Sequence, residues 1–373
     1  MADFKGMNGM IALKRVALTC AALVLAGLAG CSSSSTHIAY VTLPTSNSIA
    51  AFRVSNHSGK FTSVVGSPFA AGNSPNSIVL DPANKFPYAA NQTGNDISLF
   101  KIDHSTGGLT EVTPRTPAGI SPVALAMDSA GTFLFAANVS SSNISVYSIN
   151  AGTGVLTEVS GSPFPVSPGA SPVALTISPS GKYLYVASST LGVVFGYSIG
   201  SGTGLLQQVL GSPFAVGSGP FSVAVDPTEH FVYVANSLSD TISVLSLDAS
   251  TGMLTSLPNS PFTAGTNPVS MAIDSAGKFL YVANLGGNNV SAFSLDSTTG
   301  VPTELTTPKS PFAAGTRPIF ATIDSTGKFL YVANENSRDI SGFNIDSSTG
   351  GLTNGSIAAS VGSAPTSVAT TTK

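Results

Sequence analysis

The sequence predicts an all-β fold, namely a seven-bladed β-propeller of four-stranded blades. Three observations predict it: one strand phrase is repeated seven times, each repeat holds four strand-like segments, and the two ends of the repeated region complement each other. The aromatic residue of the phrase recurs about every fifty residues, at Tyr40, Tyr88, Phe135, Tyr185, Tyr233, Tyr281 and Tyr331. This period indicates one supersecondary unit that buries its apolar face only against its neighbours.

The sixth repeat illustrates the four strands. Pro268–Ile273 alternates and is rich in β-formers, which predicts a first strand. Asp274–Gly277, with Asp first and Gly fourth, is typical of a type I turn. The apolar run Lys278–Ala283 predicts a second strand that is buried on both faces. Val290–Leu295 alternates as a third strand, and Val301–Leu305 is a weaker fourth, which together are typical of a propeller blade.

Both ends of the chain contribute to one blade. Ile38–Val41 is a second strand without a first strand before it, and Pro365–Thr370 is a first strand with nothing after it. Three N-terminal strands and one C-terminal strand should therefore form a composite 3+1 blade. Such a blade closes the ring and leaves no open sheet edge. We expect six complete blades and this composite one over residues 38–373.

The first thirty residues are expected to be an export signal. Lys14-Arg15 precedes an apolar run, Val16–Leu28, which is too short to span a membrane as a helix. The segment Leu28–Cys31 resembles the lipobox of bacterial lipoproteins, which implies cleavage before Cys31 and lipid attachment to it. We therefore expect a signal peptide at 1–30, a Ser-rich tether at 31–37 and an anchor in the cell envelope, on its periplasmic or surface face. The alternative is a soluble secreted protein in which Cys31 is incidental.

Composition excludes several classes of function. Charged residues make up 9% of the chain and the net charge is −3, so no basic surface for nucleic acid is expected. Cys20 lies in the signal, which leaves Cys31 as the single cysteine of the mature chain and excludes an internal disulfide. No phosphate-cradling Gly loop, zinc-ligand spacing or nucleophile elbow is present. We expect no cofactor and no metal.

The histidines and turn aspartates are expected to be structural or superficial. His57 and His104 fall in turns, His230 begins a second strand, and all three map to the face opposite the channel mouth; His37 is placed in the tether. Aspartates begin the turns after third strands, where they could suggest calcium, but no loop gathers enough oxygen ligands. They are better explained as turn-capping residues, at Asp103, Asp248, Asp296 and Asp346.

The loops that follow the second strands are the candidate recognition surface. In a propeller they lie on the same face as the channel mouth, and here they vary whereas the tight turns repeat. Only the loop Glu335–Asp339 is rich in charge, and Arg317 precedes the first strand of the same blade. Glu335, Arg317 and Arg338 are therefore candidate catalytic residues. The alternative is a solvated surface ion pair.

The repeated Tyr-Val-Ala-Asn strand and the Asp-Ser-x-Gly turn before it resemble those of the seven-bladed lactonase family. This family includes bacterial 6-phosphogluconolactonase and surface proteins with Tyr-Val-Thr-Asn repeats, and the resemblance covers residues 38–373. It implies that an enzyme carries Pro-Arg-His at the start of a first strand and Asn-Glu after the second strand of that blade. Asn334-Glu335 matches the second element. The dipeptides after the blade-start prolines contain no Arg-His: they are Asn76-Ser77, Val123-Ala124, Val173-Ala174, Phe221-Ser222, Val269-Ser270, Ile319-Phe320 and Thr366-Ser367.

Two functions are compatible with these features. The first is a lipid-anchored envelope propeller, a binding or scaffold module that takes a protein or a glycan at its loop face. The second is a divergent lactonase outside the cytoplasm, in which Glu335 activates water and Arg317 or Arg338 stabilises the oxyanion. The missing Arg-His element favours the first, as does export, because sugar phosphates are cytoplasmic. A charged, deep channel mouth would indicate the enzyme, and a flat face lined by Ser, Asn and Thr the binding module.

Overall fold

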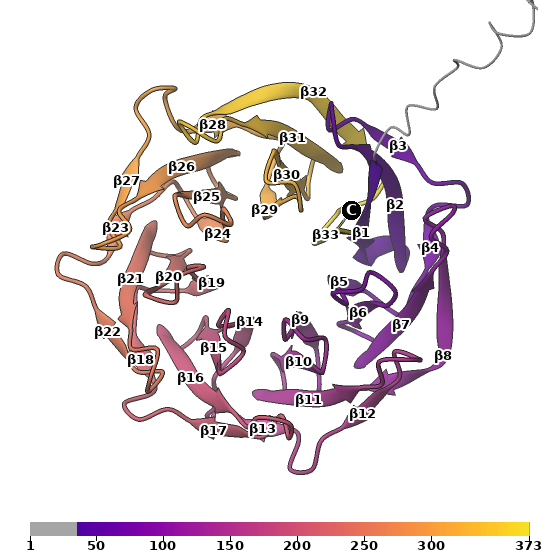
Figure 1. Cartoon of the computed structure of the whole chain (residues 1–373), viewed down its shortest axis with the longest axis horizontal. Helices are drawn as coiled ribbons and strands as arrows, with labels where there is room; N and C mark the ends of the chain where they lie inside the picture. Colours follow the sequence, from indigo (N-terminus) through magenta and orange to yellow (C-terminus); the bar gives the residue numbers. More distant parts are fainter. Residues whose placement is uncertain (1–35, 373) are drawn as a thin grey trace, which may run out of the picture. The chain divides into compact units, whose positions relative to one another are not determined.

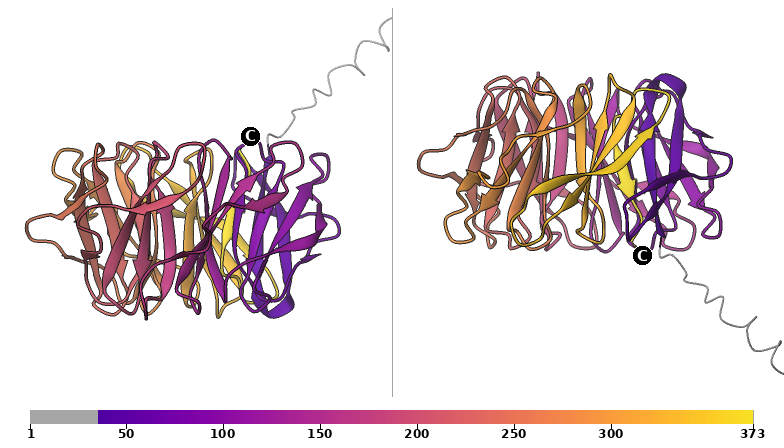
Figure 2. Two further views of the ribbon diagram at one scale, coloured as in Figure 1. Left: turned by 90° about the horizontal axis from the view of Figure 1, so that it is seen from below. Right: turned by 90° about the horizontal axis from the view of Figure 1, so that it is seen from above.

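The computed structural model describes residues 36–372, which form a closed ring of seven β-sheets around a central axis (Figure 1). The prediction of seven blades is confirmed. Figure 2 shows the ring edge-on, with the strands running between two loop-bearing faces. The predicted signal peptide, Cys31 and the tether as far as residue 35 lie outside the described residues. Within the described residues no helix is long and apolar enough to cross a membrane.

The first blade is the predicted composite of both chain ends. Its sheet has the order β3-β2-β1-β33, and Tyr40 of β1 pairs with Ala369 of β33. A short helix, η1, joins β1 to β2, and a short strand, β4, pairs with β2. The bounds are β1 (Thr36–Leu43), η1 (Pro44–Ser46), β2 (Ser48–Ser55), β3 (Phe61–Ser63), β4 (Phe69–Ala70) and β33 (Val368–Thr370).

The second and seventh blades have four strands each, numbered from the channel outwards. They are β5 (Pro75–Leu80), β6 (Pro87–Asn91), β7 (Asp96–Ile102) and β8 (Leu109–Pro117), and β29 (Pro318–Ile323), β30 (Phe329–Asn334), β31 (Asp339–Ile345) and β32 (Leu352–Ser360).

The third to sixth blades each add a two-residue fifth strand. The third holds β9 (Pro122–Met127), β10 (Phe133–Asn138), β11 (Asn143–Ile149), β12 (Leu156–Glu158) and β13 (Phe164–Pro165). The fourth holds β14 (Pro172–Ile177), β15 (Tyr183–Ser188), β16 (Val193–Ile199), β17 (Leu206–Gln208) and β18 (Phe214–Ala215). The fifth holds β19 (Pro220–Val225), β20 (Phe231–Asn236), β21 (Thr241–Leu247), β22 (Leu254–Ser256) and β23 (Phe262–Thr263). The sixth holds β24 (Pro268–Ile273), β25 (Phe279–Asn284), β26 (Asn289–Leu295), β27 (Pro302–Glu304) and β28 (Phe312–Ala313).

The repeated Ser-Pro-Phe tripeptide explains the fifth strand, which the sequence did not predict. The outer strand leaves the sheet after three residues, and the serine hydroxyl then accepts a hydrogen bond from a third-strand N–H that would otherwise lack a partner. Ser162 accepts from the Val146 N–H at 2.9 Å, and Ser260 from the Val244 N–H at 2.9 Å. The phenylalanine then begins the short strand. The second and seventh blades lack Ser-Pro-Phe, and their outer strands instead run for nine residues.

Buried second-strand tyrosines join neighbouring blades. The Tyr281 hydroxyl donates at 2.9 Å to the Gly350 carbonyl, which lies in a turn of the next blade. Burial raises the pKa of Tyr281 well above its ordinary value, so the hydroxyl stays protonated and can donate even in alkaline solution. The same bond recurs at other blade junctions, from Tyr40 to Gly107, Tyr88 to Gly154, Tyr185 to Gly252 and Tyr233 to Gly300.

The junction of the seventh and first blades departs from this pattern. The Tyr331 hydroxyl is buried and has no hydrogen-bond partner among the described residues. His37 lies nearby, with the two ring centroids 6.4 Å apart. Its placement in the tether is wrong, because β1 begins at Thr36 and its pairing with β2 turns His37 inward, to 1% exposure, with Nδ1 2.6 Å from Asn56 Oδ1. The other histidines are exposed, at His57, His104 and His230.

The two kinds of tyrosine should respond differently to loss of the hydroxyl. Tyr281→Phe should lower the free energy of unfolding by about 1–2 kcal/mol, because it leaves the Gly350 carbonyl without its donor. Tyr331→Phe should be neutral or stabilising, because it removes a buried hydroxyl with no partner among the described residues. Urea unfolding of the two variants measures the difference. Equal destabilisation by both would contradict this account of the blade junctions.

Candidate functional site

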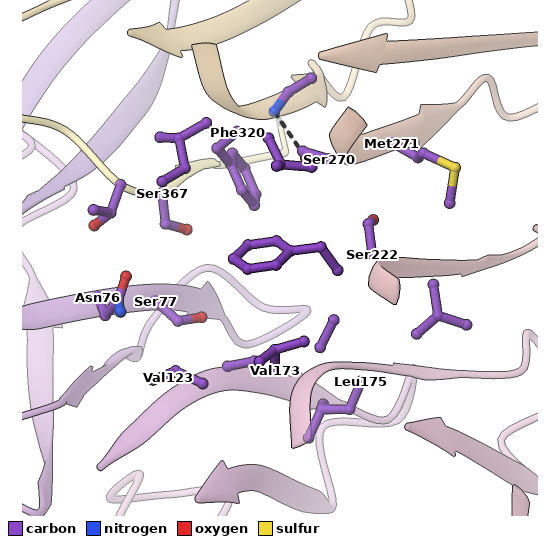
Figure 3. Close-up of a pocket in the computed structure, with 18 of the residues that line it drawn as sticks. Asn76, Ser77, Val123, Val173, Leu175, Ser222, Ser270, Met271, Phe320 and Ser367 are labelled. Atoms are coloured by element: carbon purple, nitrogen blue, oxygen red, sulfur yellow. Dashed lines mark hydrogen bonds between the residues drawn. The ribbon is translucent and has the colours of Figure 1, made fainter. Parts of the chain in front are cut away.

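A cavity of about 680 Å³ lies at the centre of the ring (Figure 3). Its wall is built by the first strands of blades two to seven and by the segment that leads into β33, which are the innermost elements in Figure 1. Two residues that follow second strands, Gln92 and Val139, complete the wall. The volume is within the range of small-molecule binding sites in proteins.

A β-bulge at the start of the first strands sets which residues reach the cavity. In the second to seventh blades, pairing with the second strand skips the residue after the blade-start proline. The skipped residue and its successor therefore both line the cavity, although strict alternation would turn one of them away. These are the dipeptides Asn76-Ser77, Val123-Ala124, Val173-Ala174, Phe221-Ser222, Val269-Ser270 and Ile319-Phe320; Thr366-Ser367 lines the cavity from the closing segment.

The wall divides into an apolar arc and a polar arc. Figure 3 shows Asn76, Ser77 and Ser367 together on one side of the cavity, with Leu175 and Met271 on the other. The polar arc consists of Asn76, Ser77, Gln92, Thr366 and Ser367. The apolar arc is supplied mainly by the other blades, through Val123, Val173, Phe221, Val269, Ile319 and Phe320.

The wall serines also connect the blades. The Ser77 hydroxyl accepts from the Leu125 N–H at 3.2 Å, and the Ser270 hydroxyl from the Ala321 N–H at 3.0 Å (Figure 3). The Ser367 hydroxyl accepts from the Ile78 N–H at 3.4 Å. First strands are sheet edges, so these hydroxyls satisfy N–H groups that have no strand partner on the channel side. Each serine keeps its own O–H available as a donor.

No ionisable side chain is among the residues that line this cavity. Lactone hydrolysis needs a base to activate water and a cation or donor set to hold the oxyanion. The cavity offers neither a carboxylate, a histidine, an arginine nor a lysine for these roles. Across residues 36–372, no group of three or more His, Cys, Asp or Glu side chains is arranged to hold a metal ion. The described residues that line the cavity thus give it an uncharged wall.

The charged loop of the seventh blade lies on the channel-mouth face but outside the cavity wall. Arg317 Nε donates to Glu335 Oε2 at 3.0 Å, and the two side chains are 44% and 32% exposed. The Glu335 N–H also donates to the Arg317 carbonyl at 2.9 Å, which fixes the two loops side by side. Gln92 and Val139 hold the equivalent positions of their blades and do line the cavity. The Glu335 carboxylate is instead occupied by Arg317.

Arg338 is not joined to this pair. Among the described residues, no hydrogen bond or ion pair connects its guanidinium to Glu335. Its neighbour Asp339 accepts from Asn334 Nδ2 at 2.6 Å and from Ser337 Oγ at 3.1 Å, so that carboxylate caps the end of β30. Among the described residues, the structure therefore joins Arg317 and Glu335 in an ion pair in which Arg338 takes no part.

Both arginines have left-handed backbone conformations. Arg317 and Arg338 each have φ 57°. The equivalent loop positions of other blades hold residues that tolerate this region or are small, such as Asn267 and Asp240. A residue with a long side chain is less stable in this left-handed conformation than Asn or Gly would be. At Arg317 the long side chain forms the ion pair with Glu335.

A second charge cluster was missed from the sequence. Arg115 contacts Glu111 through Nε to Oε1 at 2.6 Å and through Nη2 to Oε2 at 3.0 Å. The Ser98 hydroxyl donates to the same Glu111 Oε1 at 2.7 Å. Both charged residues lie on β8, the outermost strand of its blade, so they stiffen the rim and do not reach the channel. Their spacing of four residues on an unusually long strand was the available signal.

Comparisons with known proteins agree with this architecture. The family profile described as "Lactonase, 7-bladed beta-propeller" matches residues 30–170 and 176–369. No curated protein matches the chain.

Solved structures share the fold over nearly their whole length. A candidate 6-phosphogluconolactonase from Bacteroides uniformis has a TM-score of 0.80 at 21% identity, covering 90% of this chain and 99% of that one. A second candidate 6-phosphogluconolactonase, from Bacteroides fragilis, has a TM-score of 0.80 at 23% identity, covering 91% and 99%. The periplasmic gluconolactonase of Pseudomonas aeruginosa has a TM-score of 0.75 at 21% identity, covering 91% and 99%.

Proposed function

The chain belongs to the lactonase family of seven-bladed β-propellers, and from this premise we propose that it is a lipid-anchored envelope protein whose propeller binds a ligand without hydrolysing a lactone. The observation that carries the proposal is the uncharged central cavity. Every dipeptide at which the family resemblance implies an Arg-His pair is present on the wall, and none has an ionisable side chain. Catalysis there would lack an ionisable base to activate water and a cation to hold the oxyanion.

The proposed location rests on the sequence of the N-terminal segment. An apolar run followed by Leu28-Ala29-Gly30-Cys31 and four serines has the order of a lipoprotein signal. The periplasmic gluconolactonase of Pseudomonas aeruginosa provides a precedent for this fold outside the cytoplasm. In this proposal the lipid on Cys31 holds the propeller at the membrane, and the loop face or the channel takes a protein, a glycan or a small molecule.

A divergent lactonase is the second candidate function. The Asn334-Glu335 element supports it, and so do the two arginines at positive φ on the same loops. In this case the Glu335 carboxylate would activate water, and Arg317 or Arg338 would hold the oxyanion. The reaction would then take place at the Arg317–Glu335 pair on the loop face, because the channel supplies no such groups.

Lactone turnover distinguishes the two functions. We expect the purified mature protein to hydrolyse 6-phosphogluconolactone and δ-gluconolactone no faster than the buffer does. If turnover is present and this pair is the catalytic site, Glu335→Gln removes the base and should lower turnover about 100- to 10,000-fold. Glu158→Gln is the matched control, because Glu158 lies on the outer strand β12 and glutamine can still accept the Ser162 hydroxyl that it binds.

Each outcome leads to a different conclusion. Robust turnover would overturn the binding-module proposal. Robust turnover that is lost in Glu335→Gln and kept in Glu158→Gln would establish the divergent lactonase. Robust turnover that survives both substitutions would also rule out the Arg317–Glu335 pair as the catalytic site.

A further inference from the structure

We infer that the central cavity binds an uncharged, mostly apolar small molecule. Its apolar body lies against the apolar arc, and its polar end lies at Asn76 and Gln92 in the polar arc. This inference deepens the proposed function and rests on it, because it assigns the chemical class of the ligand. Four observations carry it: the electrostatics of the wall, the apolar arc, an exposed aromatic side chain, and unused hydrogen-bonding capacity in the polar arc.

The first observation is the absence of charge on the wall. An ionised ligand that enters the cavity loses water and meets no side chain of opposite charge among the residues that line it. Burying an unpaired charge is strongly unfavourable, so the wall selects against phosphates, carboxylates and amines. An uncharged ligand avoids this cost and can gain from the removal of its apolar surface from water.

The second observation is the continuity of the apolar arc. Five adjacent blades, the third to the seventh, place an aliphatic or aromatic side chain at the residue after the blade-start proline. Three of the five are valine, and the others are phenylalanine and isoleucine: Val123, Val173, Val269, Phe221 and Ile319. The bulge brings Phe320 to the wall as well. A surface of this kind contacts a flat or compact apolar molecule from several directions at once.

The third observation is Phe221, which is 37% exposed although it lines a concave site. By contrast, the aromatic residue at the centre of every second strand is fully buried. An aromatic ring left partly in water inside a cavity is a contact surface for a ligand, because covering it gains apolar burial and ring stacking. Phe221 is therefore the wall residue that we expect to contribute most to binding.

The fourth observation is the polar arc, which can fix the orientation of a ligand. Asn76 Nδ2 donates to Gln92 Oε1 at 3.1 Å. Among the described residues, Asn76 Oδ1 and Gln92 Nε2 make no hydrogen bond, so one acceptor and one donor group remain for a ligand. A hydroxyl, a carbonyl or an amide at one end of the molecule matches this pair. The arc contains no formal charge, and this matches an uncharged polar end.

Two fluorescent probes with the same ring system test the inference. N-phenyl-1-naphthylamine is uncharged, and 8-anilino-1-naphthalenesulfonate carries the same rings with an added sulfonate. On the full mature chain we expect saturable binding of one molecule of the uncharged probe, and affinity for the sulfonate that is weaker by about tenfold or more, which corresponds to about 1.4 kcal/mol.

Matched substitutions locate the site. Phe221→Ala should lower the affinity for the uncharged probe about tenfold. Leu210→Ala should leave this affinity unchanged, because Leu210 is 79% exposed on the rim, between β17 and β18. Val173→Asp should abolish binding by placing a carboxylate on the wall, and Val65→Asp, on a residue that is 91% exposed outside the cavity, should not. Circular dichroism and urea unfolding establish that each variant is folded. Phe221→Ala carries the test should Val173→Asp fail to fold.

The outcomes separate this inference from the proposed function. Equal affinity for both probes, or binding of the uncharged probe that Phe221→Ala and Val173→Asp leave unchanged, would overturn the inference. If no probe binds and no lactone is hydrolysed, the inference fails while the binding-module proposal survives through the loop face alone. If the uncharged probe binds as expected and lactone is hydrolysed, the cavity assignment stands and the binding-only proposal fails.

Discussion

A Cys31→Ser variant should be absent from the membrane fraction and should not incorporate a labelled fatty acid. In the proposed lipoprotein the sulfur and the amino group of Cys31 carry acyl chains, and several chains together give stable anchoring where one chain gives only reversible binding. Serine has no thiol for the attachment. Because the propeller begins at β1, the variant should remain fully folded while it loses the membrane.

The chain supplies its own control in Cys20→Ser. Cys20 and Cys31 are the two cysteines of the sequence, and Cys20 lies within the predicted signal, upstream of the cleavage point. Cys20→Ser should therefore label with fatty acid and sediment with membranes as the parent does. The decisive measurement is detergent phase partitioning after a high-salt wash. A Cys31→Ser protein that stays with the membranes would refute the anchor, and a parent protein that is soluble would favour simple secretion.

The ring could be predicted because its defining residues repeat. The aromatic residue at the centre of each second strand is fully buried in every blade, and an environment that recurs seven times leaves a period in the sequence. The closure was also predictable, because a strand without its neighbour at one end matched a lone strand at the other. The tight turns repeat for the same reason: backbone geometry dictates their residues wherever the turn occurs.

The site was less predictable because its residues do not repeat. The dipeptides after the blade-start prolines were singled out only for what they lack. Their role as the cavity wall depends on the β-bulge, which has no signal of its own in a single sequence. His37 was misplaced for a related reason: its burial depends on pairing with β2 and on packing against the seventh blade, far away in the sequence. Arg317 and Glu335 lie side by side, as the sequence indicated, because Arg317 precedes β29 and Glu335 follows its partner strand β30.

Removal of residues 364–373 should lower the free energy of unfolding by about 5 kcal/mol, the sum of several hydrogen bonds at about 1 kcal/mol each and the burial of Val368. Val368 is 2% exposed and pairs with Val41 across the closing contact. Backbone bonds flank it on both sides, from the Thr42 N–H to the Ser367 carbonyl at 3.1 Å and from the Thr371 N–H to the Ile38 carbonyl at 2.9 Å. Without β33, β1 becomes an open sheet edge facing the channel.

A point substitution tests the same closure without shortening the chain. Val368→Asp places a carboxylate in the buried closing strand, and should destabilise the ring by about 3–5 kcal/mol because the charge has no partner there. Val65→Asp makes the same change at a position that is 91% exposed and should alter the urea midpoint little. If β33 holds the ring closed, the truncated protein and Val368→Asp should both have much lower urea midpoints than Val65→Asp. Similar midpoints for all three would mean that the other six blades hold the ring together without the closing strand.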